Sequence, residues 1–208
     1  MSVVGIIPAG GSGERLGAER PKAFVVCAGR PLVDWSIEVL GAVCDRVVVA
    51  GPAGHLREGW VEGGPSRSAS VRNALAAAPE ASRVVVHDAA RPLVTEELVR
   101  ECLGALLGVD GVVAGAPVSD TIKEAYPDGT VVRTLDRSSL WAVQTPQVFR
   151  ADTLRRALDV DDELLAAATD DASLVEAAGG TVRVVEALPE NLKVTTAADL
   201  ARAEAALC

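Results

Sequence analysis

Aromatic side chains are scarce in this chain of 208 residues: they make up 3% of it, although apolar residues make up 49%. The core must therefore be built mainly from alanine, valine and leucine, a composition typical of parallel sheets that are covered by helices. A chain of this length can form one domain with a substantial core and is too short for two domains of ordinary size. We expect a single α/β domain over residues 1–208.

Paired cysteines and long apolar runs are also lacking. The four cysteines lie far apart, without the spacing of a zinc site or of a disulfide framework. No basic segment followed by a long apolar stretch opens the sequence, and no apolar run reaches the length of a transmembrane helix. These absences predict a soluble, cytoplasmic protein without a membrane partner.

Positive charge is in short supply. The formal net charge of −9 argues against nucleic acid or an anionic membrane as the main partner. An anionic ligand would need the positive charge to be concentrated in one cleft. Only Lys22, Lys123 and Lys193 are lysines among the 20 basic residues, which suits sites that need a compact ammonium group. A compositional bias towards arginine explains the same usage equally well.

The most informative segment is a glycine-rich loop after the first apolar run. Residues 3–7 have the valine and isoleucine content of a buried strand, and residues 8–13 then read Pro-Ala-Gly-Gly-Ser-Gly. A loop so nearly bare of side chains can present backbone N–H groups to an anion. It lacks the third glycine of the dinucleotide-binding fingerprint, and Lys22 is not part of the Gly-Lys-Ser/Thr sequence of a P-loop.

Two cations follow that loop, Arg15 and Lys22. Together with the loop amides, a guanidinium and an ammonium group could hold a triphosphate and neutralise the charge that builds up on a phosphorus under attack. A tight surface turn with two solvated cations is the alternative. We favour the phosphate-binding interpretation because a predicted strand precedes the loop.

Predicted strands and helices alternate along most of the remaining chain. Helices are expected over residues 32–44, around 71–78, from Thr95 to Leu106 and after Thr196, and strands over residues 46–50, 84–86, 111–116 and 182–185. Two short helices are expected after residue 149, and the acidic residues 159–163 are expected to form a solvated loop. Residues 144–147 offer hydrogen bonds but no nucleophile.

Polar residues follow the third predicted strand, where an open parallel sheet binds its ligands. Asp88 is well placed there to hold Mg²⁺ or a sugar hydroxyl, and Arg91 to hold a phosphate. His87 is expected to be structural. The serines of residues 66–70 precede a helix, so capping of that helix and contact with a base and a sugar are both open for them.

The alternation breaks at residues 117–140. Two extended runs flank the turn Tyr126-Pro127-Asp128-Gly129, which predicts a β-hairpin. A hairpin by itself is at best marginally stable in water. This arm is therefore expected to pack on another chain.

Seven segments carry a family resemblance when they are taken in order: residues 8–15, 21–22, 87–92, 120–123, 136–137, 145–147 and 191–195. Together they resemble the 2-C-methyl-D-erythritol 4-phosphate cytidylyltransferase family. The resemblance implies a Rossmann-like nucleotidyltransferase domain with a mostly parallel sheet between helices and a hairpin arm for dimerisation. It also implies a Mg²⁺-dependent reaction in which CTP and methylerythritol phosphate give CDP-methylerythritol and pyrophosphate.

The resemblance also implies roles for individual residues. It makes Arg15 and Lys22 the stabilisers of the transition state at the α-phosphorus, and it makes Arg137 and Lys193 the residues that position the sugar phosphate. Further contacts to that acceptor are expected from Arg91, Thr121, Thr145 and Thr169. Nucleotide contacts are expected from Pro8, Ala9, Gly10, Gly11, Ser12, Gly13, Gly64, Ser70 and Asp88, and Asp88 would also hold the metal. Thr121 and Arg137, on the arm, would complete the site of the neighbouring subunit in a homodimer.

The chemistry agrees with this assignment. The attacking group is already an anionic phosphate oxygen, so no general base is needed, and the sequence offers no Ser-His or paired-carboxylate constellation. Two anions must instead be brought together in line, and positioning with charge neutralisation can supply most of the acceleration.

Two residues depart from the family's pattern: Pro65 stands where an acidic residue is common, and Asp171 stands where glutamate is usual. The first puts one cytidine contact in question, and the second is expected to have a mild effect. The alternatives are a D-ribitol 5-phosphate cytidylyltransferase, a molybdopterin nucleotidyltransferase, a catalytically silent nucleotide-binding regulator and an α/β domain without a site. Residues 87–92 and the arm argue against the molybdopterin nucleotidyltransferase, and the retained cations argue against the silent regulator.

Overall fold

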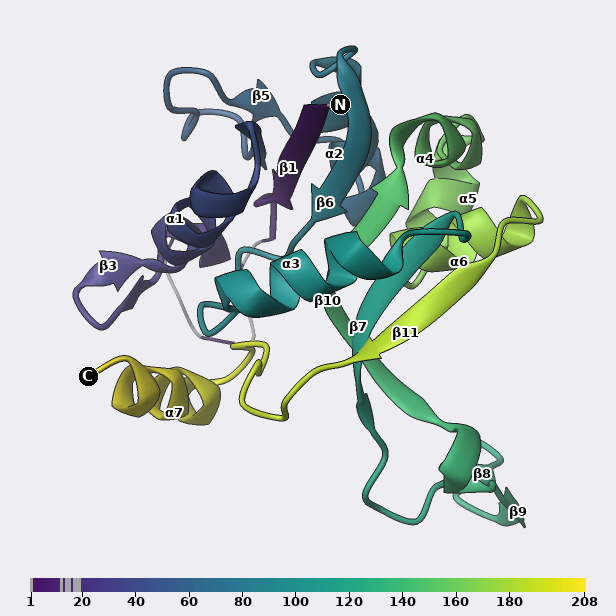
Figure 1. Cartoon of the computed structure of the whole chain (residues 1–208). Helices are drawn as coiled ribbons and strands as arrows, with labels where there is room; N and C mark the ends of the chain where they lie inside the picture. Colours follow the sequence, from purple (N-terminus) through teal and green to yellow (C-terminus); the bar gives the residue numbers. More distant parts are fainter. Residues whose placement is uncertain (1, 12, 14–15, 17–19) are drawn as a thin grey trace.

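A seven-stranded sheet organises the computed structural model, which describes residues 2–11, 13, 16 and 20–208. Its strands are β1 (Ser2–Pro8), β4 (Arg46–Gly51), β5 (Val61–Glu62), β6 (Ala81–Val86), β7 (Gly111–Pro117), β10 (Trp141–Arg150) and β11 (Val182–Glu186). They lie in the order β11-β7-β10-β6-β1-β4-β5 (Figure 1). Every pair is parallel except the two that β10 makes with β6 and β7. The predicted mostly parallel sheet is confirmed.

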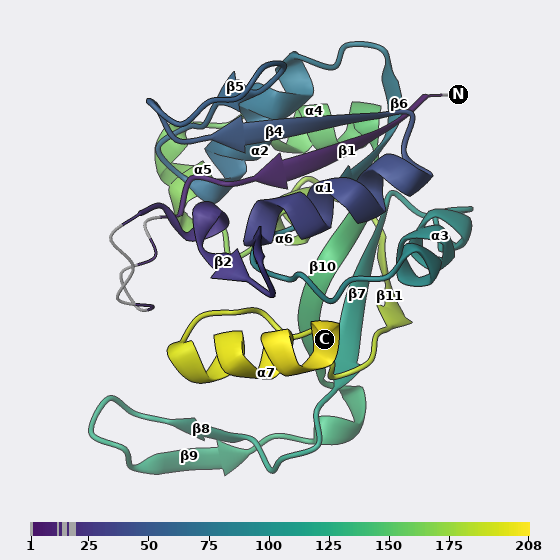
Figure 2. The same cartoon turned by 90° about the vertical axis from the view of Figure 1, so that its left-hand side faces the viewer.

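Helices cover both faces of this sheet, as Figure 2 shows. Side chains of a strand alternate between the two faces, so Val4 and Ile6 of β1 join one core cluster and Val3 and Ile7 join the other. The first cluster also contains side chains from α2 (Arg67–Ala76), α4 (Ala151–Ala157), α5 (Asp162–Ala167) and α6 (Asp171–Ala177). The second contains side chains from α1 (Leu32–Val43) and α3 (Glu96–Ala105). Valine, alanine and leucine dominate both clusters, as the composition predicted.

Smaller elements extend this body. The short hairpin of β2 (Val26–Cys27) and β3 (Arg30–Pro31) packs with α7 (Ala197–Leu207) in a third cluster. The helices predicted from Thr95 and after Thr196 are confirmed as α3 and α7. Each threonine caps its helix by accepting a hydrogen bond from the backbone N–H three residues later. None of the helices in the described part of the chain is both long and apolar enough to span a membrane. The cytoplasmic location stays a prediction.

The arm contains β8 (Lys123–Ala125), β9 (Val131–Thr134) and the 3-10 turn η3 (Arg137–Ser139). β8 and β9 pair antiparallel, and the hairpin projects from the body (Figures 1 and 2). All residues of both strands are exposed, including Val131 at 53%. The hairpin thus offers apolar side chains that nothing in this chain covers among the described residues.

The second half of the chain differs from the predicted elements. Residues 141–150, for which no element was predicted, form β10, a central strand whose ladder with β7 is interrupted between Val143 and Gln147. The prediction of a solvated loop over residues 159–163 was only partly right, because α5 begins at Asp162. The prediction of two short helices was wrong, because three are present, α4, α5 and α6. Acidic residues are favourable in the first turn of a helix, and Leu165 of α5 is buried in the first core cluster.

The two neighbouring leucines of α5 test this correction. Leu165 is 1% exposed and Leu164 is 57% exposed. We expect Leu165→Ala to lower the free energy of unfolding by about 2–5 kcal/mol, whereas Leu164→Ala should change it by no more than about 0.5 kcal/mol. Urea unfolding of both variants measures the difference. Equal effects would mean that residues 162–167 do not form this helix in solution.

Candidate active site

A cavity of about 590 Å³ opens at the carboxyl ends of β1 and β6. This is the edge of a parallel sheet at which ligands bind. Four segments line it: the glycine loop with the residues that follow it up to Ala23, the loop before α2 with the first turn of α2, the residues after β6, and the turn before α7. The lining residues are Pro8, Ala9, Gly10, Gly11, Gly13, Leu16, Lys22, Ala23, Gly64, Pro65, Ser66, Arg67, Ser70, Asp88, Ala89, Ala90, Lys193 and Thr195.

The glycine loop is fastened to the segment that carries Lys22. The Lys22 amide donates to the carbonyl of Gly11 at 3.0 Å. Gly13 has a φ of +81°, and a Cβ there would lie 3.3 Å from Cα of Lys22, so glycine suits this position on both counts. The predicted site residues Ser12 and Arg15 lie outside the described residues.

The loop before α2 is shaped by its serines and by a close approach. Ser66 caps α2 by accepting from the Ala69 amide at 3.1 Å, and the Ser70 hydroxyl accepts from the Gly64 amide at 3.0 Å and donates to the Ser66 carbonyl at 2.9 Å. A Cβ on Gly64 would lie 2.5 Å from that of Ala69. The capping interpretation is thus confirmed for Ser66, while both Gly64 and Ser70 also line the cavity.

A chain of four charges crosses the cavity wall. Asp88 accepts from Arg67 Nε at 2.9 Å on one carboxylate oxygen and from Lys193 Nζ at 2.6 Å on the other. Arg67 also donates from Nη1 to Asp171 at 2.6 Å. The chain therefore balances two carboxylates with two cations, and it connects α2, α6, the end of β6 and the turn before α7.

Burial and pairing act in opposite directions on these groups. Burial opposes ionisation of Asp88, but Arg67 and Lys193 outweigh it and hold the pKa of Asp88 well below its ordinary value. Burial likewise opposes the charge on Arg67, yet Asp171 and Asp88 raise the pKa of Arg67. For Asp171, which is fully buried, burial wins and raises the pKa in spite of Arg67. Asp88 is therefore a firmly ionised carboxylate at the cavity.

His87 and Thr145 support the loop that carries Asp88. Nδ1 of His87 lies 3.0 Å from the Thr145 hydroxyl, and Nε2 lies 3.2 Å from the carbonyl of Arg91. Burial lowers the pKa of His87 to about 4, so its ring is neutral near pH 7. The Thr145 hydroxyl also accepts from the Asp88 amide at 3.1 Å. His87 thus has the structural place that its sequence context predicted.

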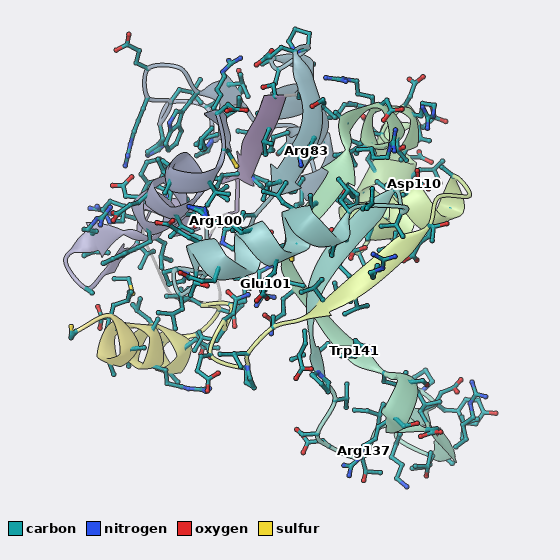
Figure 3. The ribbon with its side chains drawn as sticks, viewed as in Figure 1. Arg83, Arg100, Glu101, Asp110, Arg137 and Trp141 are labelled. Carbon is teal, nitrogen blue, oxygen red and sulfur yellow. The ribbon has the colours of Figure 1, made fainter. Side chains whose placement is uncertain are left out.

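Several predicted acceptor contacts do not line the cavity. Thr145 and Arg91 are buried beside it, and Nη1 of Arg91 donates to the carbonyl of Asn191 at 2.6 Å. Thr169 is exposed before α6. Thr121 and Arg137 belong to the arm, where the Arg137 guanidinium donates to the Ser119 carbonyl (Figure 3). The chain does not bring those two arm residues to its own cavity.

Known proteins resemble this chain over nearly its whole length. Residues 3–208 match the model of the family described as IspD: 2-C-methyl-D-erythritol 4-phosphate cytidylyltransferase. The chain belongs to this family. The resemblance inferred from the seven segments is confirmed.

Relatives and solved structures agree on this family. The family member of Nocardia farcinica is 44% identical, over 99% of this chain and 94% of the relative, and that of Synechococcus elongatus is 41% identical, over 96% and 93%. The crystal structure of the enzyme from Thermus thermophilus superposes with a TM-score of 0.84 at 36% identity, covering 99% of this chain and 98% of the other. All three carry the name 2-C-methyl-D-erythritol 4-phosphate cytidylyltransferase.

The two residues expected to depart from the family's sequence pattern, Pro65 and Asp171, lie in or beside the cavity. Pro65 is part of its wall, so a backbone donor is missing there. Asp171 reaches Arg67 with one oxygen, while Oδ1 is buried without a hydrogen bond to any described residue. The shorter aspartate thus keeps the ion pair and leaves one oxygen unsatisfied.

Sequence reasoning assigned no role to Arg67, which joins these parts. A signal was available, since Arg67 lies inside the conspicuous Gly-Gly-Pro-Ser-Arg segment at the start of a helix. Its two carboxylate partners lie 21 and 104 residues later in the chain. No local pattern could have paired it with both of them.

Arg67 and Arg72 form a matched test on α2. Arg72 also binds a carboxylate, Asp162, but that pair is exposed. We expect Arg67→Met to lower the free energy of unfolding by about 3–5 kcal/mol, because it leaves Asp171 buried and unpaired. Arg72→Met should cost no more than about 1 kcal/mol.

The deficit of Arg67→Met should shrink as the pH falls, because protonation of Asp171 removes the unpaired charge. Denaturant titrations of both variants between pH 5 and 8, in steps of about one pH unit, measure this change in the free energy of unfolding. A deficit as small as that of Arg72→Met, or one that grows with acid, would contradict the pairing.

Proposed function

We propose that this protein transfers CMP from CTP to 2-C-methyl-D-erythritol 4-phosphate, releasing pyrophosphate and forming 4-CDP-2-C-methyl-D-erythritol. One observation carries the proposal: residues 3–208 belong to the family of that name, with relatives at 41–44% identity over nearly full length. The comparisons do not favour a ribitol phosphate acceptor or a silent regulator. Lys22 and Lys193 both line the cavity, which also supports an active transferase.

The residues divide between the two substrates. A phosphate oxygen of the acceptor attacks the α-phosphorus of CTP, a new phosphorus–oxygen bond forms, and the bond to the β-phosphate breaks with its electron pair going to pyrophosphate. We assign the glycine loop, Gly64 and Ser70 to the nucleotide, and Arg15 and Lys22 to the charge that develops at the α-phosphorus. Lys193, which lines the cavity, is assigned to the acceptor. Arg137 and Thr121 are assigned to it from the arm of a partner subunit, and Arg91, Thr145 and Thr169 are assigned to its surroundings. No side chain needs to accept a proton in this step.

Asp88 suits a Mg²⁺ ion. Mg²⁺ is commonly held by one or two carboxylates together with substrate phosphates, and Asp88 offers one ionised carboxylate at the cavity. Each of its oxygens already accepts from a cation, but a carboxylate has about four acceptor sites in all. No group of three or more metal-ligating side chains occurs among the described residues. When bound, the ion would neutralise phosphate charge, and Asp88 would hold it next to the triphosphate.

We also propose a homodimer that forms through the arm. The arm and its base expose Tyr126, Val131, Val132, Trp141 and Val143, and a second copy of the chain would cover them. Arg137 lies in the arm, away from the body of its own subunit (Figure 3). In the dimer, Thr121 and Arg137 would complete the cavity of the partner.

Pyrophosphate release tests the function directly. We expect turnover with CTP and 2-C-methyl-D-erythritol 4-phosphate, none with D-ribitol 5-phosphate, and loss of turnover when EDTA removes Mg²⁺. Turnover with D-ribitol 5-phosphate alone would be consistent with the proposed mechanism but would show that the proposed acceptor is wrong. Silence with both acceptors, while CTP still binds, would favour the regulator. Turnover that EDTA does not affect would contradict the role of the metal.

Mixed dimers test the contribution of the arm. We expect Lys22→Ala and Arg137→Ala each to be nearly inactive alone. A heterodimer of the two would have one site with both residues intact, so an equal mixture refolded together should recover roughly a quarter of the wild-type rate, provided that subunits pair at random. If Arg137 serves its own subunit instead, no mixture recovers activity.

A further inference from the structure

A cluster of rings lies beside the segment that carries Lys22. The ring centroid of Phe24 lies 5.4 Å from that of His55 and 5.9 Å from that of Trp60. The guanidinium carbon of Arg57 lies 5.5 Å from the centroid of Phe24 and 5.0 Å from that of Trp60. The sequence contains only three tryptophans and two phenylalanines. The other phenylalanine, Phe149, is buried in the first core cluster, and this ring cluster joins one tryptophan to Phe24.

The loop of residues 52–60 is anchored on the sheet and on α1. Atom Cε3 of Trp60 lies 2.8 Å from where a Cβ on Gly51 would be, so the indole packs directly on the end of β4. The Trp60 amide donates to the Arg57 carbonyl at 3.0 Å. Arg57 also forms an ion pair with Asp34 of α1. The rings therefore rest on fixed elements.

Phe24 transmits this anchoring to the cavity. It ends the 3-10 turn η2 (Lys22–Phe24), whose first residue is Lys22. The Phe24 amide donates to the Pro21 carbonyl at 2.9 Å, and the Lys22 amide donates to the Gly11 carbonyl at 3.0 Å. Because Phe24 and Lys22 belong to the same short turn, a displacement of Phe24 shifts the backbone of Lys22.

We propose that Arg57 and Trp60 are positioning residues for Lys22: they hold Phe24, and through η2 they set where the Lys22 ammonium group lies in the cavity. The inference rests on the proposed function, in which Lys22 stabilises the transition state. A lysine side chain is long and flexible, so the placement of its backbone limits where its charge can be. Neither Arg57 nor Trp60 lines the cavity, and each acts through Phe24.

Arg30 supplies a matched control for Arg57. Each guanidinium lies over a tryptophan ring, with Arg30 4.4 Å from the centroid of Trp35, and each pairs with a carboxylate of α1, Glu38 in the case of Arg30. Their side chains are equally exposed, at 40% for Arg30 and 41% for Arg57. The difference is that only Arg57 also lies over Phe24.

The experiment compares the steady-state kinetics of Arg57→Met, Arg57→Lys and Arg30→Met with the wild type. We expect Arg57→Met to lower kcat about tenfold, since a small misplacement of a catalytic group can cost up to about a hundredfold. The KM for CTP should stay within about twofold, because Lys22 acts on the transition state. Arg57→Lys should recover most of the rate by keeping a cation over the rings. Arg30→Met should retain the wild-type kcat.

The outcomes separate this inference from the proposed function. A wild-type protein without turnover overturns the proposed function. A wild-type protein with turnover, together with equal kcat values for Arg57→Met and Arg30→Met, overturns the inference alone. Circular dichroism at the assay temperature gives the folded fraction, and a loss of rate that only follows this fraction would make Arg57 merely structural and overturn the inference as well. Trp60→Phe serves as the second variant. Its smaller ring should release Phe24 and lower kcat by the same factor, and an unchanged kcat would overturn the role of Trp60.

Discussion

The buried carboxylate of Asp88, shared between two cations, is the interaction on which the cavity depends. Taking a carboxylate out of water is costly unless charged donors compensate for the lost hydration. Arg67 and Lys193 provide that compensation, and Arg67 is itself held by the fully buried Asp171. Four segments that are far apart in the sequence therefore meet at one balanced group of charges.

Further hydrogen bonds support this group from behind. The Thr145 hydroxyl joins the Asp88 amide to the His87 ring, and Arg91 donates to the turn that leads to Lys193. The side-chain amide of Asn191 in that turn donates to Oε1 of Gln144 at 2.8 Å and to the Thr145 carbonyl at 2.9 Å. A site that must stabilise developing charge works best when its groups need no rearrangement during the reaction. The interruption of β10 at residues 144–146 supplies several of the atoms in this support.

Much of the architecture followed from local pattern. Valine-rich runs predicted β1, β4, β6 and β7, and helical spacing with a threonine cap predicted α3. β10 was not predicted because Gln144-Thr145-Pro146 breaks the alternation of apolar and polar residues. A proline inside such a run argues against a strand unless it lies at an edge or a bulge, and here it lies where the ladder is irregular. α5 was not predicted because its acidic first turn resembles a solvated loop. Burial of Leu165 stabilises the helix, and that burial is visible only in the folded chain.

The sequence alone determined the class of the fold, the glycine loop with Lys22 beyond it, Asp88 at a strand end and the family to which the chain belongs. These features depend on residues that are close together in the chain, because the spacing of neighbouring side chains follows directly from the local backbone geometry. Only the tertiary structure decided that Arg67 bridges Asp88 and Asp171, that Lys193 completes the same group, and that Arg57 and Trp60 lie against the segment of Lys22. Each of these contacts joins segments that only the packing of helices on the sheet brings together, so no local pattern in the sequence could have predicted them.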